Sequence, residues 1–538
     1  MPVTATLLQR LRCTAVTTTL LLALPAAWAQ QQIVTLETRT AASGQRVTLD
    51  YLLDRPSAGT PHTVLVALWR GSNRLNFAGR AQPVRFGASE MLAMRAQSSL
   101  LQAGFALAFP DVPSDRSALS FAFRRDPAHA TDIAAVVQDV RKRLPEARVL
   151  LLGDTSSGTS VVHAAARMGK AIDGVVLIGA DYNNLRTFDF GRVQAPVLVL
   201  HHVDDACTST PLIEAREAAG KHRHTLVAFE GGVDGEAASV CANLSFHGLA
   251  GLETQVIDTI AAWSQGKPLP VASSTRSGMN EEVVTMPGRG FTQPALELTL
   301  LRPDGPGPFP LAVINHGRSP DQFEVRQFQR RIRFAPQARE FVRRGFAVLV
   351  PARSGQGRSG GTVPQTSCEI SRHALEDAAE IRAAMEFAAR LPYVDASRTV
   401  LVGQSAGGLA VQALASQKPE GVRAVINFAG TLRLTGNPIS EACWFNGVVA
   451  AFSGFLKTTT APSLWVYTSN DSYFDASPER VIAMYEGVLK SGAKPRLLLL
   501  PAFGNDGHSL FGDEAGIRLW LPEVEAFLRE HGLLKTAP

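Results

Sequence analysis

The chain of 538 residues is too long for one hydrophobic core, and at about 150 to 250 residues per domain it predicts two or three domains. Its composition is that of an ordinary globular protein, with 45% hydrophobic and 19% charged residues. The formal net charge of +5 comes from scattered arginines without a basic, aromatic-interleaved stripe, so we expect no nucleic acid partner.

Residues 1–29 are typical of an export signal. Two arginines precede an apolar run that ends in the small-x-small sequence "AWA" at residues 27–29. The run over residues 15–27 is shorter and richer in Thr than the about 20 apolar residues that a membrane-spanning helix needs. We therefore expect cleavage after Ala29, a secreted or periplasmic location and no membrane span.

The rest of the chain divides at residues 265–282, a stretch rich in Pro, Ser and Gly that lacks apolar periodicity and predicts a linker. The segments on either side, residues 30–264 and 283–538, repeat one another in order. We therefore expect two domains of similar length and similar fold.

Each half alternates aliphatic strands with amphipathic helices, which predicts a mostly parallel sheet covered by helices on both faces. In chain order, the elements expected in the first half are strands 62–71 and 104–115, helix 129–144, the strand and turn 149–160, and strands 174–180 and 195–207. Their counterparts in the second half are strands 309–317 and 345–357, helix 373–391, the strand and turn 400–409, and strands 423–430 and 461–474.

The turn in "VLVGQSAGGL", residues 400–409, has the Gly-x-Ser-x-Gly pattern of a nucleophile between a strand and a helix. Gly403 and Gly407 are small enough to let the two elements approach closely around Ser405. The turn also aims the backbone N–H of Ala406 towards a developing oxyanion. We expect Ser405 to be a catalytic nucleophile.

A serine nucleophile needs a base and an orienting carboxylate, which follow it in the chain order serine, acid, histidine in this architecture. Asp471 follows the strand "SLWVYTSN", and His508 lies in "PAFGNDGHSLF" after another aliphatic run. We prefer Asp471 because it directly follows a strand. The other nearby candidates are the carboxylates Asp475 and Asp506, and the imidazoles His316, interpreted as a turn residue, and His373, interpreted as a helix cap.

The motifs "NHG", "VGQSAGG", "YTSNDSYF" and "GHSLF" occur in this order, and with them residues 283–535 resemble the α/β-hydrolase superfamily. This half is most similar to the dienelactone hydrolase and prolyl oligopeptidase-like branch. The resemblance implies a second oxyanion donor in the turn after "INHG", which we place at the Arg318 N–H. The first half resembles exported α/β-hydrolases through "HHVDDAC" and "SFHGLAG", so the fold class expected is two tandem α/β-hydrolase domains.

The first half has a less regular turn, "GDTSSG", which admits two alignments. One places Thr155 in the nucleophile position, with Ser157 where a glycine is expected. The other places Ser156 there, with Gly158 correctly spaced and Asp154 where a small residue is expected. We prefer Ser156, with the Ser157 N–H as oxyanion donor, because this alignment keeps the glycine after the nucleophile.

The other members of a triad are present in the first half. Asp205 follows the strand "PVLVLHHVD", and His247 lies ahead of the last helix of this half. Asp204 competes with Asp205 but lies one residue nearer the strand than the usual acid position. Because the turn departs from the pattern, a degenerate domain that is retained for packing or binding is the alternative to a second active site.

Removal of the signal leaves four cysteines, and an even number in an exported chain favours disulfides. We pair them within the halves, Cys207 with Cys241 and Cys368 with Cys443. The first bridge would join the loop of the acid Asp205 to the loop of His247.

The stretch "GQGRSG", residues 355–360, matches a dinucleotide-binding pattern, but Pro364 and Cys368 follow it where a helix should begin. We therefore expect no nicotinamide cofactor, and we expect no metal.

Compared with the first half, the second half has about 30 additional residues, 431–460. The aromatic side chains of this insertion have two interpretations. They could line an apolar acyl pocket under a lid, or they could form the core of the insertion itself. These residues are Trp444, Phe445, Phe452 and Phe455.

The function expected from these patterns is that of an exported serine hydrolase that cleaves small-molecule esters with a small or aromatic acyl group through an acyl-enzyme. The alternative enzyme is a serine exopeptidase of prolyl oligopeptidase type. An alternative of another class is a binding protein built on two hydrolase folds. No oligomeric state is predicted.

Overall fold

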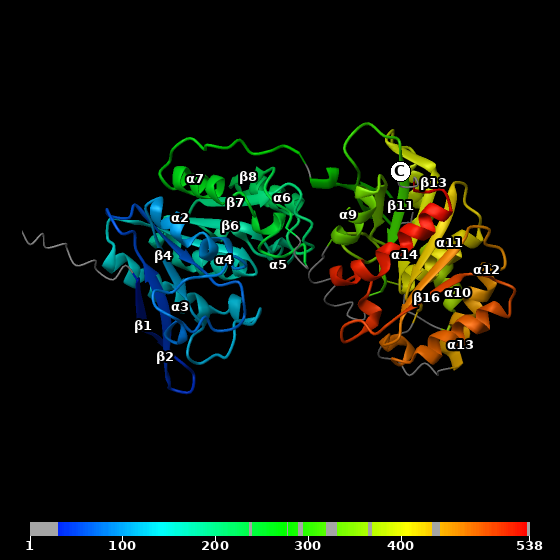
Figure 1. Cartoon of the computed structure of the whole chain (residues 1–538), viewed down its shortest axis with the longest axis horizontal. Coiled ribbons are helices and arrows are strands. Elements are labelled where there is room, and N and C mark those ends of the chain that lie inside the picture. The colour runs from blue at the N-terminus through cyan, green and yellow to red at the C-terminus, as the bar shows by residue number, and fades with distance from the viewer. Residues whose placement is uncertain are drawn as a thin grey trace, which may run out of the picture.

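Each half of the chain forms an eight-stranded, mostly parallel sheet, so the protein consists of two α/β domains (Figure 1). The computed structural model describes residues 31–235, 239–276, 278–288, 294–318, 331–363, 368–432 and 442–534. The strand order of the first sheet is β1-β2-β4-β3-β5-β6-β7-β8, and that of the second is β9-β10-β12-β11-β13-β14-β15-β16. The internal repeat therefore extends to the order of all the strands.

The elements of the first domain are β1 (Gln31–Thr40), β2 (Arg46–Asp54), β3 (Thr63–Ala67), α1 (Leu92–Arg95), α2 (Gln97–Gln102), β4 (Phe105–Pro110), α3 (Pro127–Arg143), β5 (Arg148–Thr155), α4 (Ser157–Met168), β6 (Gly174–Ala180), α5 (Tyr182–Leu185), β7 (Val197–His202), α6 (Leu212–His222), β8 (Thr225–Phe229) and α7 (Glu253–Ser264). Those of the second domain are β9 (Glu282–Met286), β10 (Leu296–Leu301), β11 (Phe309–Asn315), α9 (Ala335–Arg343), β12 (Ala347–Pro351), α10 (Ile370–Ala388), β13 (Val394–Gln404), α11 (Ala406–Ser416), β14 (Val422–Phe428), α12 (Gly447–Leu456), β15 (Ser463–Thr468), α13 (Pro478–Leu489), β16 (Arg496–Leu500) and α14 (Ile517–Glu530).

The first two strands of each sheet form an antiparallel ribbon that the sequence analysis did not predict. In the first domain β1 pairs with β2, and β2 with β4, in antiparallel fashion, whereas the remaining neighbours are parallel. β9 and β10 repeat this arrangement. The outermost strands, β1 and β9, are only partly buried, so they lack the continuous apolar run that marks a buried parallel strand.

The central strands are apolar along their whole length because helices cover both faces of each sheet. On β5, Val149 and Leu151 pack in one buried cluster with residues of α3 and α4. Leu150 and Leu152 point to the opposite face and pack with residues of α2 and α7. This two-residue alternation is the geometry of a strand that is buried on both sides.

The helix predicted over 129–144 begins two residues earlier than expected. The side chain of Asp126 accepts a hydrogen bond from the Ala128 N–H, and Pro127 occupies the first helical position. Both features favour a helix start. From there Ile133, together with further apolar residues at helical spacing, faces the buried sheet.

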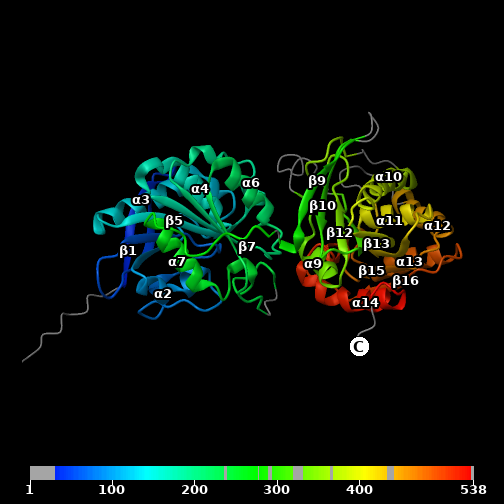
Figure 2. The ribbon, with the colours of Figure 1, turned by 90° about the horizontal axis from the view of Figure 1, so that it is seen from above.

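The two domains lie side by side, with the β9–β10 edge and α9 of the second domain nearest the first (Figures 1 and 2). Within the described ranges, no helix combines the length and the hydropathy required to cross a membrane.

The parallel strands place the catalytic candidates of each half at one edge of its sheet. β5 runs parallel to β6, and β6 to β7, so the carboxyl ends of these strands lie together. The same holds for β13, β14 and β15 in the second domain. Residues that follow these strands can therefore meet, although they are distant in sequence.

Candidate active sites

Ser405 lies between β13 and α11 in a backbone conformation that few residues other than glycine adopt, with φ 55° and ψ −124°. The flanking glycines explain how this turn can form. A Cβ on Gly403 would collide with the Gly407 carbonyl, and a Cβ on Gly407 would collide with the carbonyls of Asn315 and His316. The Gly-x-Ser-x-Gly pattern is therefore required by the close approach of strand, helix and the turn after β11.

His508 and Asp471 meet beside this turn. His508 Nδ1 lies 2.9 and 3.1 Å from the two carboxylate oxygens of Asp471, whose side chain is buried. The side chain of Gln404, the residue before Ser405, donates a hydrogen bond to the His508 carbonyl at 3.2 Å. The imidazole loop is thereby attached to the nucleophile turn, and the three residues predicted for the triad gather at one edge of the sheet.

The hydrogen bonds of the described residues do not include one between the Ser405 hydroxyl and the His508 imidazole. Such bonds are often long in the absence of substrate and tighten in the Michaelis complex. The structure thus shows the acid–imidazole pair formed and the serine next to the imidazole loop.

Tyr473 is a member of this site that the sequence analysis missed. Its ring stacks on the His508 imidazole, with ring centroids 3.8 Å apart and an interplanar angle of 18°. Its backbone N–H donates to Asp471 Oδ1 at 2.9 Å. The available signal was an aromatic residue two positions after the acid, but aromatic residues are common in such loops.

Asp506 binds the backbone of the imidazole loop instead of the ring, so it is not the orienting acid. It accepts hydrogen bonds from the Ser472 N–H and hydroxyl and from the His508 N–H, at 2.6 to 3.0 Å. Burial raises the pKa of Asp506, but the hydrogen bonds from Ser472 and His508 outweigh burial and hold this pKa below its usual range. The other alternative, Asp475, forms an ion pair with Arg480 at 3.1 Å.

The turn after β11 lies against Ser405. A Cβ on Gly317 would be 2.9 Å from the Ser405 Cβ. The buried Arg353 binds this turn, because its guanidinium donates to the His316 carbonyl at 2.6 Å and its backbone N–H donates to His316 Nε2 at 3.0 Å. Burial lowers the pKa of His316 well below its ordinary value, so this ring is a neutral acceptor and part of the turn.

The two oxyanion donors expected in the second domain flank Ser405. Ala406 is the first residue of α11, where a backbone N–H has no acceptor in a preceding helical turn. Arg318 follows Gly317, and its side chain forms an ion pair with Asp377 at 3.2 Å, which directs its guanidinium towards α10. Both N–H groups remain predictions as donors.

The aromatic residues of α12 pack the core of the domain. Phe452 lies against Trp465 of β15, with ring centroids 4.5 Å apart, and Phe455 is buried in the same cluster. Trp444 donates to the Thr431 hydroxyl at 3.1 Å. Of the two interpretations of the insertion, packing therefore holds for Phe452 and Phe455. Residues 433–441 of the insertion lie outside the described ranges.

In the first domain the residue at the nucleophile position is Thr155, and the alignment that favoured Ser156 is wrong by one residue. Thr155 ends β5 with φ 43°, whereas Ser156 has the ordinary helical values φ −68° and ψ −28°. A Cβ on Gly153 would lie 2.9 Å from the Ser157 carbonyl oxygen. This is the same close approach that Gly403 makes in the second domain.

The hydrogen bonds agree with this register. Thr155 Oγ1 lies 2.7 Å from His247 Nε2, and His247 Nδ1 lies 3.0 Å from Asp205 Oδ2. The hydroxyl of Ser156 points elsewhere and donates to the Arg70 carbonyl at 2.8 Å. The structure thus brings together Asp205 and His247, as predicted, with Thr155 instead of Ser156.

The same shift corrects two further expectations. Ser157 takes the place of Gly407, and its hydroxyl donates to the Asp154 carbonyl at 2.8 Å and accepts from the Asp154 N–H at 2.9 Å. It therefore corresponds to Gly407 and not to Ala406, whose counterpart is Ser156. Asp154 corresponds to Gln404 and not to Gly403, so no small residue is required there. Burial raises the pKa of its carboxyl.

Glycine spacing does not identify the nucleophile in this turn, because a serine, Ser157, is small enough for the position two residues after it. Gly158 packs elsewhere, since a Cβ on it would lie 3.0 Å from the Ala180 Cβ. Its presence in the sequence reflected contact between α4 and β6 and gave no information on the nucleophile.

Asp205 is bound through both of its carboxylate oxygens. Besides His247, it accepts from the Cys207 N–H and from the Thr210 hydroxyl, each at 2.8 Å. Burial raises the pKa of Asp205, but the positive charge and hydrogen bond of His247 outweigh burial and lower this pKa to about 2. Asp204 instead forms an ion pair with Arg276 at 2.5 Å, so Asp205 is the partner of the imidazole.

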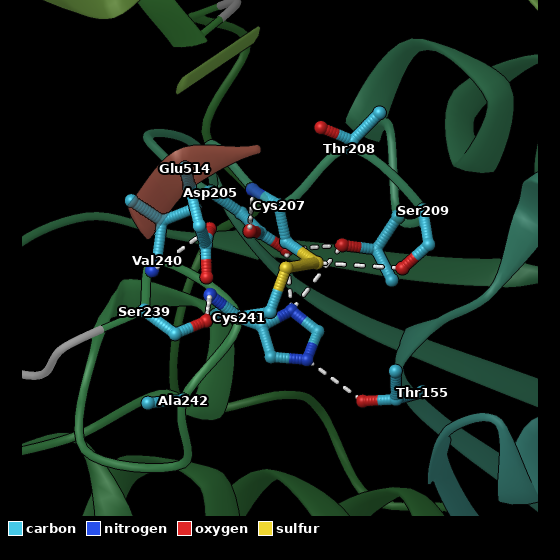
Figure 3. Close-up of a disulfide and its surroundings, with 12 residues drawn as sticks. Thr155, Asp205, Cys207, Thr208, Ser209, Ser239, Val240, Cys241, Ala242 and Glu514 are labelled. Carbon is cyan, nitrogen blue, oxygen red and sulfur yellow. Dashed lines mark hydrogen bonds and ion pairs between the residues drawn. A yellow bond between two sulfur atoms is a disulfide. The ribbon is translucent and has the colours of Figure 1, made fainter. Parts of the chain in front are cut away.

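Both cysteine pairs are those predicted. The Cα atoms of Cys207 and Cys241 are 4.8 Å apart, and those of Cys368 and Cys443 are 5.5 Å apart. The first disulfide joins the Asp205 loop to the segment before His247 (Figure 3). Cys207, Asp205 and His247 gather closely enough to suggest a metal site, but the disulfide removes the thiolate that would bind the ion.

Comparisons with known proteins complete these observations. The family model described as serine aminopeptidase, S33, matches residues 330–493, a range that contains Ser405 and Asp471. No match was found among the curated proteins.

Solved structures similar to parts of this chain include two esterases and a peptidase. Thermogutta terrifontis esterase 2 has 19% identity and a TM-score of 0.33, covering 49% of this chain and 100% of that chain. Est1E from Butyrivibrio proteoclasticus has 18% identity and a TM-score of 0.32, covering 46% and 98%. Pyrococcus horikoshii acylaminoacyl peptidase has 15% identity and a TM-score of 0.34, covering 48% and 42%.

Proposed function

Since the chain is a serine hydrolase of the α/β-hydrolase superfamily, we propose that it hydrolyses carboxylic esters through an acyl-enzyme on Ser405. The observation that carries this proposal is the nucleophile turn. Ser405 has φ 55° at the end of β13, next to the loop in which Asp471 binds His508 Nδ1. Strained residues of this kind persist where the surroundings determine them, and they cluster at active sites.

In the proposed acylation step, His508 Nε2 accepts the Ser405 proton while Oγ attacks the ester carbonyl carbon. Asp471 holds the imidazole with its proton on Nδ1 and stabilises the imidazolium that forms. The N–H groups of Ala406 and Arg318 bind the oxyanion. The carbon–oxygen bond of the ester then breaks, and the alcohol leaves with the proton returned by His508.

Deacylation repeats the sequence with water as the nucleophile. His508 takes a proton from water, the hydroxide attacks the acyl carbon, and Ser405 leaves with the proton. The stacked ring of Tyr473 restrains the imidazole plane during both steps.

Export is part of the proposal. It is supported by the signal-like pattern of residues 1–29, which lie outside the described residues. It is supported as well by the two disulfides, which are typical of proteins in oxidising compartments.

The first test is the exchange Ser405→Ala in the full chain, with Ser416→Ala, at the other end of α11, as the matched control. We expect Ser405→Ala to lower kcat/KM for a 4-nitrophenyl ester by about 1000-fold or more, since loss of a triad nucleophile removes most of the rate enhancement. Ser416→Ala should retain wild-type activity. Thermal unfolding should be alike in all three proteins.

Wild-type turnover in Ser405→Ala would overturn the assignment of Ser405. Loss of activity in both serine variants, with unchanged unfolding, would contradict it as well, because the Ser416 hydroxyl donates to the Ala413 carbonyl at the far end of the helix from Ser405.

A serine exopeptidase is the second candidate, because the matching family model is described as a serine aminopeptidase. Ester and peptide substrates are separated by the measurement of kcat/KM for a series of 4-nitrophenyl esters and for aminoacyl 4-nitroanilides. We expect turnover of the esters, with short acyl chains preferred. Turnover of the anilides at a comparable kcat/KM would favour the exopeptidase.

A further inference from the structure

We propose that the first domain contains a second ester-hydrolysing site whose nucleophile is the hydroxyl of Thr155. This site is separate from that of Ser405 and would act on carboxylic esters with a small acyl group. Its acid and base are Asp205 and His247.

The backbone at Thr155 is the first argument. A β-branched residue with φ 43° is a genuine outlier, and such strain costs on the order of 1 to 3 kcal/mol. A turn with only a structural purpose would be better served by Gly or Asn, which adopt positive φ readily. A strained threonine at the position of Ser405, at the end of the corresponding strand, therefore indicates that the hydroxyl has a use.

The hydrogen bonds form an uninterrupted chain from hydroxyl to carboxylate. Asp205 accepts from His247 Nδ1 at 3.0 Å, which places the ring proton on Nδ1 and leaves Nε2 as an acceptor. Nε2 lies 2.7 Å from Thr155 Oγ1, within the reach required of a general base. His247 is 3% exposed and Asp205 4%, so little water competes for these bonds.

The imidazole is held in place by its loop as well as by the acid. The Ser245 hydroxyl accepts a hydrogen bond from the His247 N–H at 3.2 Å, just as Asp506 does for His508 in the second domain. The Cys207–Cys241 disulfide attaches this loop to the acid loop (Figure 3). A degenerate site would not be expected to keep every one of these supports.

The turn after β3, which corresponds to the turn after β11 beside Ser405, is also bound by a buried arginine. The buried Arg124 donates to the carbonyls of Trp69, Arg70 and Gly71 at 2.8 to 3.0 Å. A planar trans peptide whose carbonyl is bound on one side presents its N–H on the other. Arg124 therefore does for this turn what Arg353 does for the turn beside Ser405.

The proposed reaction balances without a cofactor. Thr155 Oγ attacks the ester carbonyl carbon and transfers its proton to His247 Nε2. The carbon–oxygen bond of the ester breaks, the alkoxide takes this proton, and an acyl-threonine remains. Water then attacks the acyl carbon, with His247 as the base, and releases the acid and Thr155. The γ-methyl group of Thr155 crowds the attacking oxygen, so small acyl groups are preferred.

The linker and the second domain both contact the loops of this site, so the full chain has to be used. Glu514 accepts a hydrogen bond from the Val240 N–H at 3.2 Å, next to Cys241 (Figure 3). Arg276 pairs with Asp204, and Gly278 packs against the Val203 carbonyl with no room for a Cβ. A fragment that ends near residue 264 would lose all three contacts.

The experiment measures hydrolysis of 4-nitrophenyl acetate by the full-length Ser405→Ala protein and locates the acetyl group by peptide mass after an acid quench. We expect slow turnover, with the acetyl group on Thr155. Thr155→Val should abolish both. The matched control is Thr159→Val, the same exchange one helical turn further on. The Thr159 hydroxyl is buried and has no hydrogen-bond partner in the described part of the chain, so this variant should keep both the turnover and the acetylation of Thr155.

Two more variants keep the test decisive if Thr155→Val does not fold. Thr155→Ser removes the crowding methyl group and should raise the acetylation rate, whereas a structural threonine would show no gain. His247→Gln should reduce acetylation to the uncatalysed level.

Absence of acetylation in Ser405→Ala, with full activity in the wild-type protein, would overturn this inference and leave the proposed function of Ser405 intact. Acetylation of Ser156 would overturn it as well. Acetylation of the wild-type protein on Thr155 alone would instead overturn the assignment of Ser405.

Discussion

At the scale of single residues, the two sites differ in what surrounds the acid. Asp471 binds His508 and caps the short turn that follows it, through the Tyr473 N–H. Asp205, which is buried like Asp471, binds His247, the Cys207 N–H and the Thr210 hydroxyl. A buried carboxylate with three partners is stabilised strongly in its ionised form.

This difference predicts a pH dependence for Asp205. Its pKa is about 2 in the folded protein, below the ordinary value of 3.8, so its ionised form contributes stability above about pH 4 that is lost as the pH falls through 2. The contribution is about 2 kcal/mol. The free energy of unfolding of the wild-type protein should therefore exceed that of Asp205→Asn most at neutral pH, and the gap should narrow towards pH 2.

Urea unfolding of both proteins at a series of pH values measures this gap. The difference between the two proteins cancels the carboxylates they share. A gap that stays constant from pH 7 to pH 2 would show that the carboxyl is not held ionised by His247.

At the scale of elements, the functional loops follow the carboxyl ends of parallel strands and are attached to one another by side chains. In the first domain, the disulfide Cys207–Cys241 joins the loop after β7 to the segment that carries His247. In the second domain, Cys368–Cys443 joins the start of α10 to the insertion before α12. The first bridge therefore connects two loops of one site directly, whereas the second connects a helix to the insertion.

Removal of the two bridges separately should distinguish these purposes. Replacement of either cysteine pair by alanines should lower the free energy of unfolding by about 2 to 4 kcal/mol, because each bridge closes a loop in the unfolded chain. Only the Cys207→Ala/Cys241→Ala protein should also lose acetylation of Thr155, measured in the Ser405→Ala background. Equal acetylation in both double variants would contradict the positioning of His247 by its disulfide.

At the scale of the whole molecule, a cluster of charged side chains joins the two domains. The carboxylate of the buried Glu214 in α6 forms ion pairs with the guanidinium groups of Arg331 and Arg358 of the second domain, each at 3.0 Å. Glu217, one turn further along α6, pairs with the same two arginines at 2.9 and 3.4 Å. The loop after β12, which contains both Arg353 and Arg358, is thereby attached to the first domain.

Loss of the central carboxylate of this cluster should weaken the contact between the domains. Glu214→Gln leaves buried guanidinium groups partly unpaired and should destabilise the protein on the order of 2 kcal/mol, since Glu217 compensates in part. It should also speed cleavage of the linker in limited proteolysis. Glu523→Gln, which breaks the half-exposed pair with Arg496, is the matched control and should change little.

The opposite result is that the Glu214→Gln protein unfolds at the same denaturant concentration as the wild-type protein and that its linker is cleaved at the same rate. That result would show that these ion pairs do not hold the domains together.

Much of the fold followed from local pattern. Aliphatic strands alternate with amphipathic helices in each half of the chain. This pattern predicted two α/β domains, and the structure confirms them. The outermost strands β1 and β9 were not predicted because partly exposed edge strands lack an uninterrupted apolar run. In the second domain, the Gly-x-Ser-x-Gly turn and the order of acid and histidine were enough to predict which three residues gather, because each residue follows a strand whose end is evident in the sequence.

The sequence by itself determined the repeat, the Ser405 turn, the pairing of the cysteines and the identities of Asp205 and His247. Only the tertiary structure decided between Thr155 and Ser156. That choice depends on which of two adjacent hydroxyls reaches an imidazole 92 residues away, and on a backbone with positive φ that a β-branched residue rarely adopts. Neither property is local to "GDTSSG": the packing of α4 against β6 and the disulfide between the acid and histidine loops set them.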